Sequence, residues 1–285
     1  MKRIWKTVIA GVIIAIGGVV VLLCALGAAG WDVENVTEWQ TDTYKATNEV
    51  RKLEIKVNAG KVIISRGTTD TVTVRYEHNE VYQTNVSENN YGALSIEAGQ
   101  KKWYKVTLWY DDAPTTEIEI GRNCKPTLNL TLNAGSVYFR DGNWGERVDV
   151  TVNAGLLEFN SGLTAEELKV KINAGAMRAS KIDCQQVTCH LNAGKFEVNE
   201  IVCDKFDCHV SAGAVEVKKL DSSNIKADVS AGSATLNVRG FKWDYNIMVD
   251  KSAGSCNVSS QMGNTGKIIQ IDLSAGSVTV TFENW

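Results

Sequence analysis

The sequence has few prolines and histidines and no excess of basic residues. It holds 2 prolines and 3 histidines among 285 residues, and its formal net charge is -3. A chain without a basic surplus lacks the electrostatic footprint of nucleic-acid-binding proteins, so we expect no nucleic-acid partner. The sequence also lacks Gly-x-Ser-x-Gly, His-Glu-x-x-His and a phosphate-binding loop. These absences argue against common hydrolase, metalloprotease and nucleotide-binding mechanisms.

A long uncharged segment lies near the N-terminus. It runs from Thr7 to Ala29, and Lys2, Arg3 and Lys6 precede it. About 20 helical residues span a bilayer core, so the segment predicts one transmembrane helix over residues 7–29. The cationic tail should stay in the cytoplasm and the remainder of the chain should be exported.

A cleaved signal peptide is the alternative interpretation of this segment. Cleavage sites with small residues exist at Ala25-Leu26-Gly27 and Ala28-Ala29-Gly30. The apolar core of a signal peptide usually has about 7–15 residues, and this one is longer. We therefore favour an uncleaved anchor at the cell membrane, with residues 1–6 as a cytoplasmic tail and residues 30–50 as an extracytoplasmic stem.

The rest of the chain carries an internal repeat. The tripeptide Asn-Ala-Gly or Ser-Ala-Gly occurs nine times, and from the second copy onward the steps are 20, 20, 19, 19, 19, 22 and 22 residues. Such a period is typical of proteins built from stacked units. The copies begin at Asn58, Asn133, Asn153, Asn173, Asn192, Ser211, Ser230, Ser252 and Ser274.

Apolar residues alternate on both sides of each tripeptide. Val148, Val150 and Val152 precede Asn153, and the alternation resumes with a shifted phase after the glycine. Period two indicates a strand with one buried face, and the phase change indicates a corner. We predict an all-β fold for residues 51–285, a single-stranded parallel β-helix or solenoid with coils of about 19–22 residues. An antiparallel sandwich or meander is the competing architecture.

The corner residues are expected to be structural. Asparagines stacked in register can bond amide to amide, and glycine permits the turn. The period lapses over residues 67–125, which we interpret as an elaborated cap or insertion. The predicted corner residues are Asn133, Gly135, Asn153, Gly155, Asn173, Gly175, Asn192, Gly194, Ser211 and Gly213.

Four cysteines follow the repeat. Cys184 and Cys203 would stack on neighbouring coils, close enough for a disulfide, whereas Cys189 and Cys208 take inward positions of the alternation and suit a core. His190 and His209 suggest a zinc site with the cysteines, but the spacing is not that of zinc motifs, and solvated imidazoles are favoured. We expect no metal and no cofactor.

Two functions fit these residues. An enzyme acting on extracellular polysaccharide would use acidic and basic side chains of one repeat phase, namely Glu158, Arg178, Glu197 and Glu216. A binding module would use an aromatic patch. The candidate patch residues are Trp103, Tyr104, Trp109 and Tyr110.

The repeats from Leu53 through Val280 resemble the bacterial "putative adhesin" family, a domain of unknown function with Asn/Ser-Ala-Gly repeats. The resemblance implies a non-catalytic, adhesin-like module of the bacterial envelope. Relatives often carry an N-terminal anchor, and some belong to envelope-stress or surface regulatory systems. The implied partner is an envelope polymer or another surface or membrane protein. The family supplies no catalytic residues to carry over, so we expect no enzyme.

Overall fold

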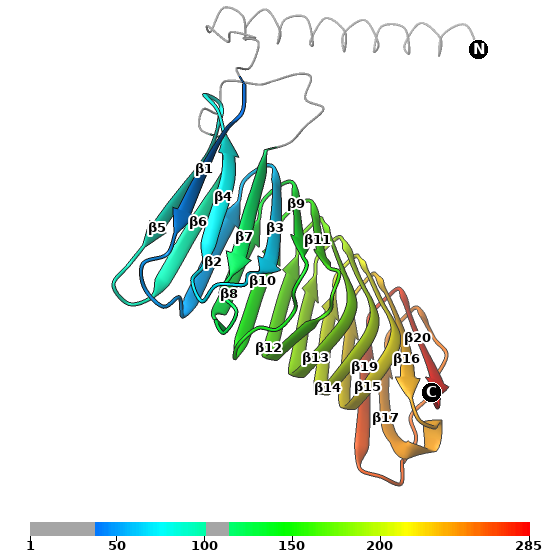
Figure 1. Cartoon of the computed structure of the whole chain (residues 1–285). Coiled ribbons are helices and arrows are strands. Elements are labelled where there is room, and N and C mark those ends of the chain that lie inside the picture. The colour runs from blue at the N-terminus through cyan, green and yellow to red at the C-terminus, as the bar shows by residue number, and fades with distance from the viewer. Residues whose placement is uncertain (1–37, 101–113) are drawn as a thin grey trace, which may run out of the picture.

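The computed structural model describes residues 38–100 and 114–285. This part of the chain is all-β apart from one 3-10 helix, η1, at Lys242–Asp244, and its strands form one continuous sheet wound into an elongated solenoid (Figure 1). The strands are β1 Gln40–Lys45, β2 Lys52–Val57, β3 Lys61–Arg66, β4 Thr73–His78, β5 Tyr82–Glu88, β6 Ala93–Gln100, β7 Thr115–Ile120, β8 Thr127–Leu132, β9 Ser136–Phe139, β10 Arg147–Val152, β11 Leu156–Phe159, β12 Leu163–Ile172, β13 Ala176–Leu191, β14 Lys195–Val210, β15 Ala214–Val229, β16 Ser233–Arg239, β17 Tyr245–Lys251, β18 Ser255–Cys256, β19 Lys267–Leu273 and β20 Ser277–Glu283.

Each coil has two walls and a third side. The first wall consists of the strands that precede an Asn/Ser-Ala-Gly corner, and the second wall of the strands that follow it. The third side consists of the segments that return the chain to the first wall. In β13, β14 and β15 these return segments are themselves paired strand, so one strand of 16 residues bends through the third side.

The repeats stack in parallel, as predicted. Val150 pairs with Val170, and the side-chain amide of Asn153 lies within hydrogen-bond distance of Asn173. Inward residues are buried on both walls; Val148, Val150 and Val152 alternate with partly exposed neighbours along β10. Since one such unit cannot bury its apolar face alone, the shared core forms only when coils stack.

Parallel pairing does not extend through the whole described chain. At the N-terminal end β1 pairs with β4, β4 with β7, and β5 with β6, all antiparallel. The prediction of a purely parallel solenoid is therefore wrong for β1, β4 and β5 and for one edge each of β6 and β7, whereas β2 and β3 pair in parallel with both neighbours. The reason is local: the antiparallel strands lack the 19–20-residue period that brings equivalent residues side by side.

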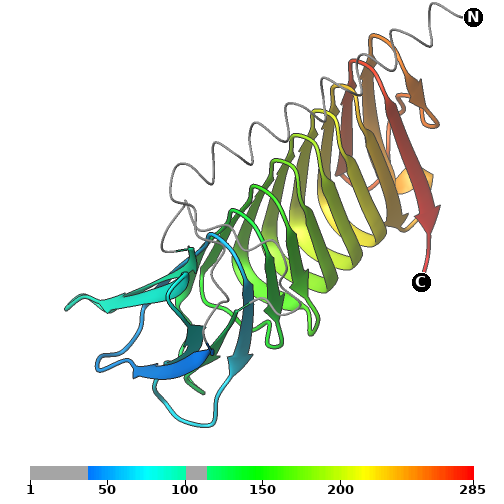
Figure 2. The same ribbon diagram turned by 90° about the horizontal axis from the view of Figure 1, so that it is seen from above.

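The coils at both ends are out of sequence order. At the N-terminal end β2 and β3 lie between the coil of β6 and β7 and the coil of β8 and β9. At the other end β19 and β20 lie between the coil of β15 and β16 and the coil of β17 and β18 (Figure 2). The last strands in the sequence are thus internal to the stack.

The stem predicted over residues 30–50 needs a correction. Residues 40–45 form β1, and Ala46 and Val50 are buried in the core. Glu88 of β5 fastens this segment, because its carboxylate accepts hydrogen bonds from the backbone N–H groups of Thr47 and Asn48 at 2.9 and 2.7 Å. This part of the predicted stem is therefore an integral layer of the fold.

The predicted transmembrane helix, residues 7–29, lies outside the described residues, as do the tail at 1–6 and the beginning of the stem. Within residues 38–100 and 114–285 no helix has the length and apolar character needed to cross a membrane.

The corners form a side-chain ladder. Asn133 Nδ2 donates to Asn58 Oδ1 at 2.7 Å, and Asn153, Asn173 and Asn192 each donate to the asparagine of the preceding coil at 2.5–2.6 Å. At Ser211, the next corner, only the backbone bond common to all these corners is present, from its N–H to the Leu191 carbonyl. The ladder holds neighbouring corners in register.

Candidate functional site

The charged residues considered for catalysis lie on the outer face of the second wall. Glu158, Arg178, Glu197 and Glu216 are in register on β11, β13, β14 and β15. Lys195 lies 2.9 Å from Glu197 and 3.3 Å from Glu216, and its hydrogen bond lowers the pKa of the Glu197 carboxyl. A general acid needs a raised pKa, so this ladder is a surface ion-pair network.

The histidines and cysteines considered for zinc are not brought together. His190 and His209 stack on the outer face with centroids 4.7 Å apart, and burial, followed by the neighbouring His209, lowers the pKa of His190. Cys189 and Cys208 point into the core, because they directly precede the histidines on their strands. The described residues contain no group of three or more side chains suited to hold a metal.

Cys184 and Cys203 occupy equivalent places on the third side, where β13 and β14 run in parallel. Both are free thiols here, so the predicted disulfide is not formed in this structure. Burial raises the pKa of Cys184 to about 12 and that of Cys203 to about 11. The thiolate needed for oxidation is therefore disfavoured. The predicted aromatic patch, Trp103, Tyr104, Trp109 and Tyr110, lies outside the described residues.

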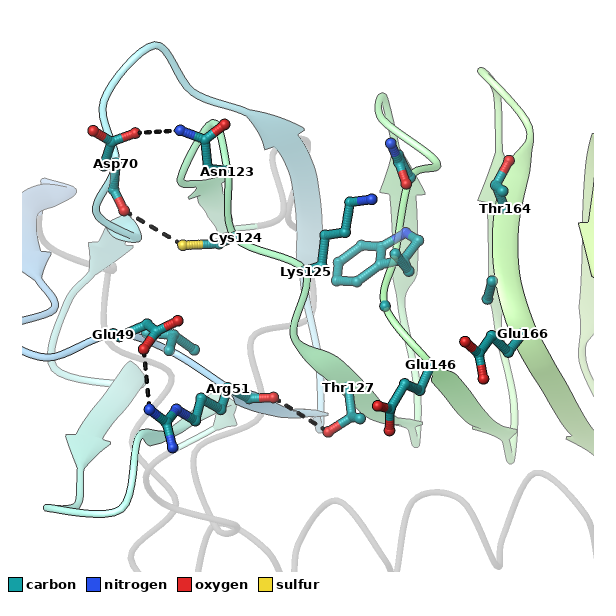
Figure 3. Close-up of a pocket in the computed structure, with 15 residues that line it drawn as sticks. Glu49, Arg51, Asp70, Asn123, Cys124, Lys125, Thr127, Glu146, Thr164 and Glu166 are labelled. Carbon is teal, nitrogen blue, oxygen red and sulfur yellow. Dashed lines mark hydrogen bonds and ion pairs between the residues drawn. The ribbon is translucent and has the colours of Figure 1, made fainter.

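An open cavity of about 920 Å³ lies on the third side, where the N-terminal layers meet the regular coils (Figure 3). Five segments separated in sequence form it: the connection from β1 to β2, the loop after β3, the loop after β7, the β9–β10 loop and the start of β12. The residues around it are Glu49, Val50, Arg51, Asp70, Asn123, Cys124, Lys125, Thr127, Asn143, Trp144, Gly145, Glu146, Thr164, Ala165 and Glu166.

Most polar groups near the cap side of the cavity have partners. Glu49 and Arg51 form an ion pair at 3.2 Å, and Asn123 Nδ2 donates to Asp70 at 3.1 Å. The Cys124 thiol donates to the Asp70 carbonyl, and burial raises its pKa. These contacts hold the cap-side wall of the cavity in shape.

Glu146 and Glu166 lie on the opposite wall of the cavity. Unlike the polar groups described above, their carboxylates have no partner among the described residues. They stand on neighbouring coils, and Figure 3 shows both side chains extending toward the side where Thr127 lies. Within the described part of the chain neither carboxylate has an ion-pair partner or a side-chain hydrogen bond. Two adjacent acceptors are therefore free to meet a ligand.

Trp144 also belongs to the lining of the cavity. Its indole packs edge-on against Phe139 at 5.4 Å, and its backbone N–H donates to Thr164 at 2.9 Å. Only 4% of the residue is exposed, yet its Nε1 has no hydrogen-bond partner among the described residues. A buried N–H without a partner is uncommon in folded proteins, and this one lies beneath the surface of the cavity.

The cavity continues into two shallower depressions along the third side, and we call the whole the third-side groove. One, of about 490 Å³, shares Thr164, Ala165 and Glu166 with the cavity; the other, of about 500 Å³, shares Glu146 and Glu166. Asp183, Asp204 and Asp221 line the first depression. Sequence analysis missed this groove, although an acidic residue recurring in successive return segments was a usable signal.

The Toastrack DUF4097 family matches residues 50–284. The chain belongs to this family. The match spans the first core strand through the last coil, which are the repeats that carried the resemblance to adhesins, and the resemblance is therefore confirmed.

Solved structures with the same fold are named "putative adhesin". One from Parabacteroides merdae has 11% identity and a TM-score of 0.57, over 85% of this chain and 96% of that one. Another from Bacteroides fragilis has 13% identity and a TM-score of 0.54, over 86% and 97%. A third, from Parabacteroides distasonis, has 11% identity and a TM-score of 0.52, over 86% and 97%. No curated protein matches the chain.

Proposed function

We propose that the chain is a non-catalytic interaction module of the bacterial envelope that binds its partner through the third-side groove. The observation that carries this proposal is the pair of carboxylates of Glu146 and Glu166, which line the cavity on neighbouring coils without an ion-pair or side-chain hydrogen-bond partner in the described chain. The adhesin names of structural relatives support a role in surface interactions.

The proposal includes a membrane anchor. The uncharged stretch of residues 7–29 and the preceding basic tail support a single-pass protein with a cytoplasmic N-terminus and an extracellular solenoid. An uncleaved anchor requires that the mature chain keep its N-terminal residues. Mass spectrometry of the native N-terminus tests this. A mature protein beginning near Ala28 or Trp31 would contradict it.

Capture from envelope fractions tests the interaction. Full-length protein in membrane nanodiscs is incubated with cell-wall polymer and with solubilised membrane proteins, and bound material is analysed. The variant with Glu146→Gln and Glu166→Gln should lose the captured component. Glu158→Gln, on the second wall, is the matched control and should retain it. Equal capture by all three proteins would remove the groove from the proposal.

A polysaccharide-active enzyme is the second candidate. It is favoured by the pair of carboxylates without counterions in the cavity, because glycoside hydrolysis uses two acidic side chains. New reducing ends or unsaturated sugars, formed from wall polysaccharide by the wild type and absent with Glu166→Gln, would establish this candidate and overturn the non-catalytic one.

A further inference from the structure

We infer that the C-terminal end of the solenoid docks against the same end of a second copy of this chain. Five large hydrophobic side chains are exposed in the described part of the chain, and four of them lie at the end coil that contains η1, β17 and β18. We call these four, Phe241, Trp243, Met248 and Met262, the end patch. Trp243 is 59% exposed and Met262 85%. The patch is a second surface, separate from the third-side groove, so the inference goes beyond the proposed function.

Contacts between two loops bring the members of the patch together. The loop that carries Met262 lies against η1, because Gln261 Nε2 donates to the Lys242 carbonyl at 2.6 Å and the Asn264 N–H donates to the Trp243 carbonyl at 3.1 Å. Within η1 the Trp243 ring stacks on Phe241 with centroids 4.6 Å apart. Apolar side chains exposed side by side in this way mark interaction sites in soluble domains.

The hydrogen bonds at the end of the stack disfavour a partner that adds a strand. On the outer edge of β17 the Ile247 N–H donates to the Gln261 carbonyl and the Val249 N–H donates to Ser260 Oγ, both at 2.9 Å. An edge whose donors are occupied is a poor template for another strand. The partner therefore has to bind through the side chains of the end patch.

The surface around the patch carries little charge. Residues 252–266, which include β18 and the loop of Met262, contain no charged residue. At the borders of the patch, Lys242 and Lys251 are balanced by Asp244 and Asp250. Protein interfaces are enriched in Trp, Phe and Met and depleted of charge at their centre, whereas binding to an anionic membrane surface uses an excess of cations. The composition therefore favours a protein partner over a lipid surface.

A second copy is the partner that this surface fits. In a two-fold contact the same surface lies on both sides, so a net charge would face its like, and a neutral patch avoids this repulsion. The chain segments outside the described residues, 1–37 and 101–113, join the solenoid at its other end, before β1 and between β6 and β7 (Figure 1). Fully extended, residues 101–113 could reach out and return over only about 20 Å, whereas the stacked coils place the end patch roughly 40 Å away. Residues 1–37 include the stretch that the proposed function assigns to a membrane.

Sedimentation of the full chain in lipid nanodiscs, at one copy per disc, tests the inference. Wild-type discs should pair reversibly as the protein concentration rises to about 100 μM, the range of a small and weak interface. Trp243→Ser combined with Met262→Ser should weaken pairing at least about tenfold, because a two-fold contact loses each side chain twice. Met262→Ser alone, at the more exposed position, should also weaken pairing and keeps the test valid if the double variant unfolds.

Tyr91→Ser is the matched control, because Tyr91 is 89% exposed and lies in the β5–β6 turn at the other end of the solenoid. This variant should pair like the wild type, and so should the variant with Glu146→Gln and Glu166→Gln, which separates the end patch from the third-side groove. If the chain does not insert into discs, the proposed anchor is wrong, and the same sedimentation is run on the chain in free solution.

Three results would overturn the inference. They are the absence of pairing up to about 100 μM, equal pairing by wild type and by the end-patch variants, and association of the loaded discs with discs that hold no protein. Loss of pairing with Tyr91→Ser would indicate a head-to-tail contact and would overturn it as well. Envelope capture that still depends on Glu146 and Glu166 in these cases would leave the proposed function standing.

Discussion

At the scale of single residues, corner glycines are required for two different reasons. Gly155 has a φ of +106°, and a Cβ atom there would lie 2.2 Å from the Gly135 carbonyl oxygen. Gly175 does not have a positive φ, but a Cβ atom would lie 2.6 Å from the Gly155 oxygen and from a Val152 methyl. The sequence-based expectation of special backbone angles is thus right for Gly155 and wrong for Gly175, where space is limiting.

Alanine substitutions separate strain from crowding. Gly266 has a φ of +79° with no atom within 4 Å of an added Cβ, so Gly266→Ala should cost only the left-handed strain, about 1–2 kcal/mol. Gly175→Ala should cost about 1–3 kcal/mol through crowding alone. Gly155→Ala combines both effects and should lower the melting temperature most. Equal melting of the Gly155 and Gly266 variants would show that close coil packing is unimportant at the corner.

At the scale of elements, the asparagine ladder has interior and terminal members. Asn153 donates to Asn133 and accepts from Asn173, whereas Asn192 donates to Asn173 and is followed by a serine. An interior asparagine therefore satisfies groups on two neighbouring coils, and a terminal one on a single coil.

Replacement by alanine should reveal this difference. Asn153→Ala leaves an acceptor and a donor without partners and should cost about 1–3 kcal/mol of unfolding free energy. Asn192→Ala removes one hydrogen bond and should cost about 0.5–1.5 kcal/mol. Thermal unfolding of the two variants measures the order, and a larger loss for Asn192→Ala would contradict a ladder that acts through both sides.

The link between β1 and β5 should depend on pH. Hydrogen bonds from the Thr47 and Asn48 backbone lower the pKa of Glu88 from 4.5 to about 2. A carboxyl with a depressed pKa stabilises the fold above its unfolded value, and this contribution is lost as the pH falls through the folded value. Exchange of the Thr47 and Asn48 amides should therefore accelerate between about pH 4.5 and pH 2.

Glu88→Gln provides the comparison for this pH effect. Glutamine does not titrate, so the variant should show fast exchange at these amides already at neutral pH and little further change on acidification. A wild-type exchange profile that stays flat across the same window, after correction for intrinsic rates, would show that Glu88 does not control this segment.

Strands and register were predictable wherever apolar residues alternate within a regular period, as around Val150 and Val170. The same signals fail for β1, whose sequence from Gln40 to Lys45 is polar and largely exposed. They also fail for Glu146, Trp144 and Glu166, because a groove built from return segments depends on which coils are neighbours and not on any local motif.

At the scale of the whole molecule, the order of coils could not be inferred from spacing. Asn58 lies beside Asn133, 75 residues away, although the repeat period is 19 or 20 residues in the middle of the stack. Asparagine at both positions was compatible with this pairing but did not require it. Nothing in the local pattern indicates that β19 inserts between β15 and β17.

Hydrogen exchange measures this order directly. β19 is paired along both edges, whereas β17 pairs with β19 and meets no strand on its other edge in the described chain, where an isolated bridge to Gln261 and the Ser260 hydroxyl bond Ile247 and Val249. Backbone amides of residues 245–251 should therefore exchange faster than those of residues 267–273. A stack in sequence order would place β19 and β20 at the exposed end and give the reverse result.

The out-of-order end coil also constrains how the chain matures. Loop closure becomes more costly and slower as partners move apart in sequence, so the middle coils should assemble first. Strand β2 meets β6 only after about 41 residues, and β8 only after 75. If the chain is exported N-terminal end first, β2 emerges as an apolar strand with neither edge paired. Until translocation delivers β8, this nascent edge is the segment most exposed to misassembly with other chains.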